Sequence, residues 1–216
     1  MSGREWKKKT RKRVTAFKLE NGRCFRISNV KIRFKTDRPF DNVKKLIADL
    51  SLIFGVTTYG NTFTVRAGDC VFICLFSGNI NATGFASLDD IPQILELFSL
   101  IFPTYLNQPE GTDFIIDNIS LFGRVGKRVF SQFPLDVSIF EDRPARKYSF
   151  NNFSFPGATL KGEKGTLVIF ATGSVIVLGI KSEAAFPLFR SLLNYMIRNK
   201  GRLLTRPKEE VISLQF

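Results

Sequence analysis

Hydrophobic and polar residues alternate along residues 24–34, which predicts a half-buried strand. The residues on its apolar side are Val30, Ile32 and Phe34. The dipeptide Asn21-Gly22 just before this run is a strong hairpin signal, so residues 14–20 are expected to form an extra strand. Glycine-containing turns separate further strand-like runs, which lie near 61–66, 70–76 and 79–83.

Two stretches have apolar residues at helical spacing instead. Residues 39–53 begin with Pro39 and predict a first helix. A second helix is expected from Ser87, because Asp90 three positions later resembles a capping box. The apolar positions of this second helix are Ile91, Ile94, Leu95, Phe98 and Ile101.

The same plan recurs in the second half of the chain. It predicts a strand near 113–122, a weak helical segment near 134–141 and a final helix over 182–199. Strands are expected between the two helical segments, near 148–153, 157–161, 166–171 and 174–179. The inner face of the final helix carries Phe186, Phe189, Leu193 and Met196.

An internal repeat explains this recurrence. Gly78, Gly84, Ser87 and Pro92 return at a constant offset of 95, and residues 28–32 match residues 117–121 at an offset of 89. With one residue inserted before the second turn glycine, Cys74 aligns with Val168 and Phe76 with Phe170. We therefore expect a first repeat over 14–105, a second over 111–199, an arm over 1–13 and a tail over 200–216.

Each repeat combines helices with antiparallel strands, which predicts an α+β fold with helices on one face of a sheet and the other face open. The open face is expected to hold amides, hydroxyls, a cation and large apolar side chains, a mixture typical of a binding surface. Its expected residues are Asn29, Lys31, Cys74, Phe76, Asn81, Thr83, Asn118, Ser120, Val168 and Phe170.

Charge points to a polyanionic partner, because 32 Lys and Arg against 19 Asp and Glu give a formal net charge of +13. Residues 1–13 carry a cluster of cations that suits a nuclear import signal or a phosphate-binding arm, or else a solvated tail. The cations expected to form this arm are Lys7, Lys8, Lys9, Arg11, Lys12 and Arg13.

The chain has no histidine, which excludes Ser-His and Cys-His nucleophiles and histidine metal sites. Its three cysteines fit no zinc or disulfide pattern, and no apolar run approaches the length of a membrane span. Asp89-Asp90 is typical of helix capping. We therefore expect no enzyme, metal site, cofactor, small-molecule substrate or membrane association.

The run from Phe155-Pro-Gly-Ala-Thr-Leu160 through Leu167-Val-Ile-Phe-Ala-Thr-Gly173 to Glu183 resembles the second repeat of the TATA-box-binding protein (TBP) family. The resemblance covers about residues 24–199. It implies a saddle of two pseudo-symmetric halves, with a curved antiparallel sheet, helices on the convex face and a concave face that sits on the minor groove of DNA. In that family, phenylalanines insert between base steps.

The resemblance also assigns roles to individual residues. It implies two wedge pairs, Phe63 with Phe76 and Phe155 with Phe170. Asn29 and Asn118 would contact base edges in the groove, although they could also be ordinary polar residues at strand ends. The remaining DNA contacts would come from Thr83, Val168 and Lys31. Other positions depart from the family pattern, namely Asn79, Asn81, Ser120, Ser174 and Leu178.

Two functions follow from the resemblance. The first is a TBP-like general transcription initiation factor in the nucleus, or at a site of viral transcription, that binds A/T-rich duplex DNA and recruits initiation factors or RNA polymerase. The alternative is a TBP-fold interaction module that has lost specific DNA binding and binds or mimics transcription factors. A weaker hypothesis is an accessory nucleic-acid-binding domain. The divergence from the family pattern indicates a viral or fast-evolving eukaryotic origin.

Overall fold

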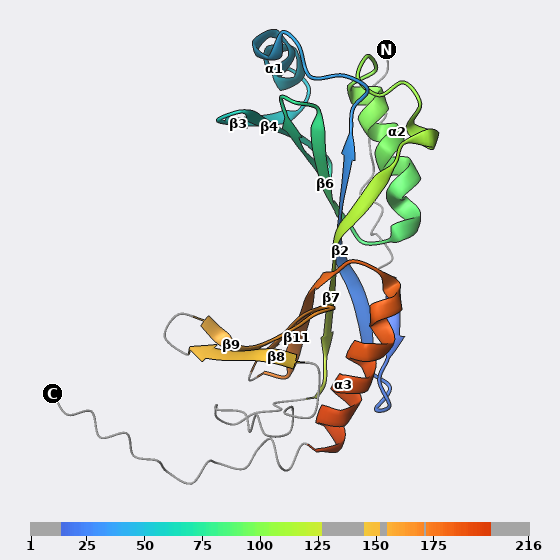
Figure 1. The fold of residues 1–216 in the computed structure, drawn as a ribbon, viewed down its shortest axis with the longest axis vertical. Helices are drawn as coiled ribbons and strands as arrows, with labels where there is room; N and C mark the ends of the chain where they lie inside the picture. The colour runs from blue at the N-terminus through green and yellow to red at the C-terminus, as the bar shows by residue number, and fades with distance from the viewer. Residues whose placement is uncertain (1–13, 127–144, 152–154, 171, 200–216) are drawn as a thin grey trace, which may run out of the picture. The chain divides into compact units, whose positions relative to one another are not determined.

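The computed structural model describes residues 14–126, 145–151, 155–170 and 172–199 (Figure 1). These residues form two compact units. The first unit comprises Val14 and Ile27–Ile115, and the second comprises Thr15–Arg26 and the described residues from Ile116 onward.

The first unit contains an antiparallel sheet with the strand order β3-β4-β5-β6-β2. Its strands are β2 (Cys24–Lys35), β3 (Gly55–Tyr59), β4 (Thr62–Ala67), β5 (Cys70–Leu75) and β6 (Asn79–Phe85). Helix α1 (Val43–Ser51) contacts β3, and helix α2 (Ile91–Ile101) lies beside β6 and β2 (Figure 1). Two 3₁₀ turns, η1 (Leu88–Asp90) and η2 (Pro109–Gly111), flank α2.

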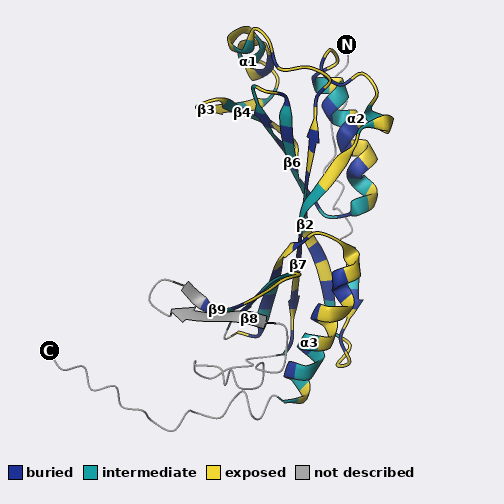
Figure 2. Ribbon diagram, in the orientation of Figure 1, coloured by how far each residue is buried: buried dark blue, intermediate teal, exposed yellow. Residues whose placement is uncertain are grey.

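Alternate side chains of this sheet form the core on the helix side. Phe98 of α2 makes edge contacts with two strand phenylalanines, at ring-centroid distances of 5.1 Å to Phe34 and 5.3 Å to Phe72. Burying such a side chain contributes about 2–3 kcal/mol. The buried and exposed positions alternate along α2 in Figure 2, as expected for a helix that covers one sheet face.

The second unit repeats this arrangement with the strand order β8-β9-β10-β11-β7. Its strands are β7 (Phe114–Arg124), β8 (Ala145–Asn151), β9 (Phe155–Gly162), β10 (Gly165–Phe170) and β11 (Ser174–Ile180). Helix α3 (Phe186–Arg198) follows the 3₁₀ turn η4 (Glu183–Ala185). The four residues predicted for the inner face of this helix are all buried.

The extra N-terminal strand exists as β1 (Thr15–Lys18), but it belongs to the second unit and not to the first repeat. It pairs with the first residues of β2, and Phe17 stacks on Phe25 at 5.2 Å and contacts Phe186 of α3 at 6.3 Å. The predicted Asn21-Gly22 turn forms, with Gly22 at a φ of 78°. Strand β1 therefore packs against α3, which is why it belongs to the second unit.

Most predicted elements that fall on described residues are present, with two differences. Strand β3 was not predicted, and it occupies residues that follow the end of the predicted first helix. Helix α1 is shorter than predicted, because Asn42 takes a left-handed conformation with a φ of 44° and the helix begins at Val43. The predicted segment at 134–141 lies outside the described residues. Ser87 does cap the turn before α2, through the Asp89 amide.

Candidate nucleic-acid interface

Strand pairing aligns the two repeats without the insertion that the sequence suggested. Cys74 pairs with Ile80 in one hairpin, and Ile169 pairs with Val175 in the other. Each pair therefore closes a turn of the same length, and the offset of 95 is constant. The counterpart of Phe170 is consequently Leu75 and not Phe76. The proposed match of Cys74 with Val168 is also wrong, because Cys74 corresponds to Ile169 and both are fully buried.

The turn hydrogen bonds give the same alignment. The amide of Gly78 donates to the carbonyl of Leu75 at 2.9 Å, and the amide of Gly173 donates to the carbonyl of Phe170 at 2.8 Å. Phe76 thus lies in the turn after β5, one residue beyond the position that Phe170 occupies in the second unit.

The face of the first unit that lies away from α2 is built from cross-strand rows of side chains, which we call the first open face. One row joins Thr57, Thr64, Ile73, Asn81 and Arg33 across all five strands. A parallel row joins Gly55, Arg66, Val71, Thr83 and Lys31. A third begins with Tyr59, Thr62 and Leu75. Neighbours in such rows have Cβ atoms about 5 Å apart, so each row is continuous.

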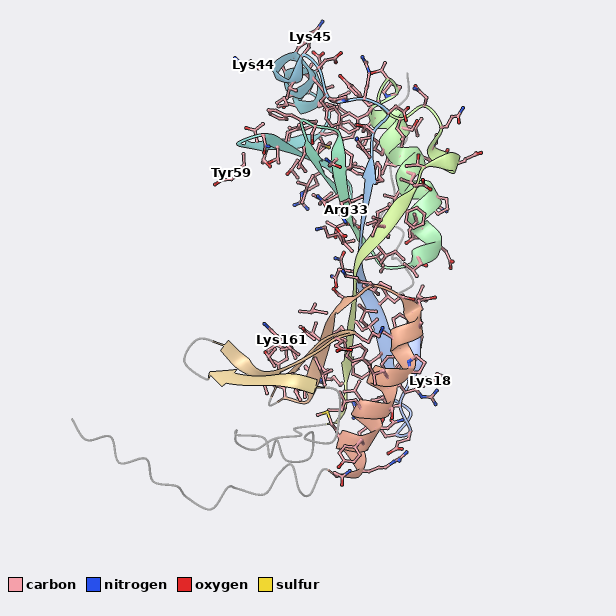
Figure 3. All side chains as sticks on the ribbon, viewed as in Figure 1. Lys18, Arg33, Lys44, Lys45, Tyr59 and Lys161 are labelled. Atoms are coloured by element: carbon pink, nitrogen blue, oxygen red, sulfur yellow. The ribbon has the colours of Figure 1, made fainter. Side chains whose placement is uncertain are left out.

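The first open face therefore has a graded chemistry. Val71, Ile73 and Leu75 of β5 form an apolar strip at its middle, and all three are half-buried. Lys31, Arg33 and Lys35 occupy every second position of β2, so three cations span about 13 Å of strand on one face. In Figure 3, Arg33 points to the side of β2 away from α2.

The corresponding face of the second unit is different in character. At the offset of 89, the uncharged Ser120 and Phe122 take the places of Lys31 and Arg33, and Lys35 corresponds to another cation, Arg124. Phe122 pairs with Ile176 of β11 and is 40% exposed, and Leu178 is 38% exposed. The sheet face opposite α3 is thus largely apolar where its counterpart is cationic.

Asn29 has a structural partner in the first unit. Its Oδ1 accepts the backbone N–H of Gly84 at 3.0 Å, and its Nδ2 donates to the Thr83 hydroxyl at 2.9 Å. The pairing of β2 with β6 shifts next to these residues, between Val30 and Lys31, and Gly84 has a φ of 94°. The asparagine side chain therefore accepts a backbone N–H at the point where the ladder is irregular.

Asn118 does the same in the second unit. Its Oδ1 accepts the backbone N–H of Gly179 at 2.5 Å, and its Nδ2 donates to the Ser120 hydroxyl at 2.9 Å. Gly179 also has a positive φ, of 76°, beside a shift in the pairing of β11 with β7. Both asparagines are half-buried. The two-fold repetition of this contact supports the repeat at atomic detail and gives the asparagines a role in the fold itself.

Phe63 cannot act as the predicted wedge, and this prediction is wrong. Its side chain is 0% exposed and lies on the helix side of β4, where its ring contacts Phe40 at 5.0 Å and Phe102 at 6.1 Å. The physical reason is strand parity, because the paired residue Cys74 faces the same core. Cys74, which was expected on the open face, is fully buried, and burial raises the pKa of its thiol.

The other predicted contact residues fall into different environments. Phe76 and Phe170 are half-buried, and Phe76 lies 6.3 Å from the Phe63 ring. Val168 is only 6% exposed and Ser120 only 7%, so neither presents much surface to a ligand. The Phe155 backbone belongs to β9, but its side chain and the basic arm over 1–13 lie outside what the structure describes.

Residues that the sequence analysis did not select lie on the first open face. Tyr59, at the end of β3, is 88% exposed and is cross-strand to Thr62, whose other neighbour is Leu75 (Figure 3). Arg33, Lys35 and Arg66 are exposed on the same face. The alternation of polar residues along β2 and β4 was the signal that could have identified these cations.

The described residues contain no group of three or more His, Cys, Asp or Glu side chains that could hold a metal ion. In the same part of the chain, no helix combines the length and apolar character needed to cross a membrane.

No protein-family model matches the sequence, and no curated protein matches it. Among solved structures, Methanococcus jannaschii TBP is similar, with a TM-score of 0.58 and 17% sequence identity over 81% of this chain and 98% of that chain. A heterotetrameric sarcosine oxidase from Corynebacterium sp. U-96 covers 89% of this chain and 91% of its own, but its 8% identity and TM-score of 0.32 support no inference. The chain therefore has the α+β fold of a TBP, with an antiparallel sheet and helices, as the repeats predicted.

Proposed function

We propose that the protein is a TBP-like transcription initiation factor that binds duplex DNA through its open sheet faces. The observation that carries this proposal is the first open face, where a line of three cations on β2 is separated from the apolar strip of β5 by one strand, β6. Cations on such a face can neutralise phosphates, while apolar side chains can contact sugars and base edges in a minor groove.

A/T-rich duplex is the expected target. The minor groove of A·T pairs offers only acceptors, N3 of adenine and O2 of thymine. An asparagine amide has two N–H donors, and one donor of Asn29 and one of Asn118 serve the Thr83 and Ser120 hydroxyls. The second donor of each amide suits a base acceptor. A guanine N2 donor at the same place would disfavour binding.

Further parts of the chain would complete this function. Phe170 and Phe76, with Phe155, remain candidates for contacts with base steps, and the arm over 1–13 would add phosphate contacts or direct nuclear import. The outer helix faces would recruit initiation factors or RNA polymerase. We propose a nuclear location and no catalytic activity.

A second candidate function is a protein-interaction module that keeps the fold without specific DNA binding. The sheet face of the second unit favours it, because Phe122 and Leu178 are exposed apolar side chains that a protein partner can cover, and β7 lacks the cations that β2 has at Lys31 and Arg33. Phe63, one of the four proposed wedge residues, is also buried in the core.

Fluorescence anisotropy with an A·T-rich duplex, a G·C-rich duplex and a single strand, across a salt titration, separates the two functions. Preference for the A·T-rich duplex that persists at moderate salt is expected for the first function. Weak binding that is equal for all three nucleic acids and disappears at moderate salt would instead support the interaction module.

Variants locate the binding face. Replacing Arg33 and Lys35 by Gln should lower the steepness of the salt dependence by about 1.8, which is about 0.9 for each phosphate that is no longer neutralised. The matched control replaces Lys44 and Lys45, two exposed cations of α1, by Gln (Figure 3). An equal change in both double variants would show that net charge alone, and not the first open face, determines binding.

A further inference from the structure

A groove of about 350 Å³ runs along the outer surface of α3 in the second unit. Its lining residues follow one stripe of the helix, and they are Pro187, Arg190, Ser191, Asn194, Tyr195 and Arg198. The turn between β1 and β2 lies against this stripe. The Glu20 backbone N–H donates to Asn194 Oδ1 at 3.1 Å, and the Glu20 carboxylate pairs with Arg198 at 2.6 Å.

The first unit shows what the corresponding stripe of α2 does. The offset of 95 places Leu95 and Ser99 at the positions of Arg190 and Asn194. There the chain turns back along its own helix: Ser99 Oγ donates to the carbonyl of Leu106 at 2.7 Å, and η2 lies against α2. Leu95 is only 3% exposed. A segment of turns and 3₁₀ helix thus already lies against this helix face in the first unit.

The α3 stripe carries arginines where the first unit has Leu95 and Pro103. Arg190 is exposed where Leu95 is buried, and no carboxylate among the described residues pairs with it. Arg190 and Arg198 are two turns apart, about 12 Å along the helix, with Asn194 between them. Because Arg198 is bonded to Glu20, the stripe offers a bound chain one cation that is not paired with a described carboxylate, Arg190, and the amide of Asn194.

We infer that this groove binds an extended acidic segment of a partner protein. A carboxylate of the segment would pair with Arg190, and a backbone carbonyl would accept a hydrogen bond from Asn194 Nδ2, as Leu106 does from Ser99. An apolar side chain would lie against Pro187 and the ring of Tyr195. The inference is independent of DNA binding, because it uses the outer face of α3 and not the sheet.

The chemistry of the groove favours an acidic peptide over nucleic acid. The Glu20 carboxylate is bonded to Arg198, which lines the groove, and would repel a phosphate backbone, whereas β2 offers three cations in one line on the first open face. A peptide with spaced carboxylates can pair with Arg190 and avoid Glu20. The partner class is therefore defined by separated acidic residues with apolar residues between them.

The test is the binding of a short fluorescein-labelled peptide, in which Asp and Glu alternate with Leu, to the full chain. The expected result is saturable binding that a peptide with Asn and Gln in place of the acids does not show. Arg190→Glu should weaken binding about tenfold, because it replaces an attraction with a repulsion. Lys45→Glu, the same charge change on the exposed face of α1, is the matched control and should leave binding unchanged.

Three results would overturn the inference. The first is equal binding of the acidic and neutral peptides. The second is an equal loss in the Arg190→Glu and Lys45→Glu variants, since this would show nonspecific attraction by net charge. The third concerns the chain's own tail, in which Glu209 and Glu210 are replaced by Lys in the full chain. If this variant binds the peptide more tightly, by a factor comparable to the loss expected for Arg190→Glu, the tail itself is the occupant of the groove. Asn194→Ala, which leaves all charges in place, should still weaken binding severalfold if the amide contact exists.

Discussion

Tyr59 and Phe63 have nearly opposite environments although only three residues separate them. Tyr59 is almost fully exposed at the end of β3, and Phe63 is fully buried among Phe40, Phe76 and Phe102. The resemblance to the TBP family implied an exposed wedge at Phe63, but strand parity puts its ring in the core and puts Tyr59 on the first open face. At the residue scale, parity decides which aromatic ring a ligand can reach.

Phe63→Ala should therefore reduce the free energy of unfolding by about 3–5 kcal/mol, as loss of a buried aromatic side chain does. Tyr59→Ala should change it by less than about 0.5 kcal/mol, because the side chain is exposed. Urea denaturation followed by circular dichroism measures both. If the proposed function holds, Tyr59→Ala should also weaken DNA binding while the fold remains intact. Equal stability losses in the two variants would contradict the assigned parity.

Asn29 and Asn118 are expected to stabilise the fold even without DNA. Replacing either by Ala removes a hydrogen bond from a glycine N–H, which costs about 0.5–1.5 kcal/mol. Asn→Asp at the same position keeps the acceptor oxygen and should retain more stability than Asn→Ala. Thermal unfolding of the two pairs of variants measures this. Unchanged unfolding in both Ala variants would mean that the asparagines serve ligand binding only.

Asp41 and Tyr105 form a short hydrogen bond that predicts a pH dependence. The bond lowers the pKa of Asp41 from 3.8, with a smaller contribution from Arg38, whereas burial and Asp41 raise the pKa of Tyr105 from 10.0. A lowered carboxyl pKa adds stability above the unfolded value, which is lost as the pH falls through the folded value. A raised tyrosine pKa adds stability below 10.0, which is lost as the pH rises through the folded value.

The stability difference between the native protein and Tyr105→Phe should therefore be largest between about pH 5 and 9 and should shrink at both extremes. Denaturant titrations across this range measure it, with Tyr195→Phe in the second unit as the matched control. A difference that does not vary with pH would show that the Tyr105 hydroxyl contributes only by packing.

At the scale of elements, the sequence predicts the hairpins and helices that occur in both repeats. It does not predict features that no local pattern of residues marks, such as strand β3 and the left-handed residue before α1. The 95-residue offset locates the hairpins and the helix starts at Ser87 and Ser182 in both units. Strand β3 was missed because its residues, Gly55–Tyr59, have no clear alternation and follow an apolar run that is typical of a helix. Left-handed Asn42 shortens α1 from its beginning in a way that apolar spacing does not reveal.

The site was less predictable than the fold for a related reason. The match of Phe76 with Phe170 favoured an alignment with an insertion, whereas backbone pairing requires none. One such shift moves every side chain of β5 to the other sheet face. The asparagine to glycine contacts join residues 55 and 61 positions apart, so no local pattern could identify them.

Gly84 provides a test of the irregular ladder itself. A Cβ at this position would clash with the Asp69 carbonyl oxygen, and its φ of 94° is unfavourable for other residues. Gly84→Ala should therefore reduce the free energy of unfolding by more than the cost of a positive φ alone, which is about 1–2 kcal/mol. Gly60→Ala is the matched control, because it has a φ of 54° with nothing within 4 Å. If thermal unfolding shows equal losses of stability in the Gly84→Ala and Gly60→Ala variants, the contact with Asp69 does not contribute to the effect.

At the scale of the whole molecule, the charge is distributed unevenly. The arm over 1–13 holds seven cations and one acid, so 7 − 1 = +6 of the net +13 precedes the first unit. Between the two repeats, the cations Lys31 and Arg33 of β2 correspond to the uncharged Ser120 and Phe122 of β7. Two sources of phosphate attraction are therefore expected, a sequence-independent arm and a first open face that combines charge with shape.

Deleting residues 1–13 should separate these sources. We expect weaker binding to every nucleic acid and a shallower salt dependence, because the arm releases counterions without reading sequence. The ratio of affinities for A·T-rich and G·C-rich duplexes should stay the same, since the groups proposed to read the groove lie in the sheets. The reciprocal variant, Lys31→Ser with Arg33→Phe, gives β2 the residues of β7 and should reduce that ratio while the arm remains. Anisotropy titrations of both variants measure this ratio of affinities. If the ratio falls to one when the arm is deleted, the arm recognises the DNA sequence, and the sheets are then available to bind a protein partner.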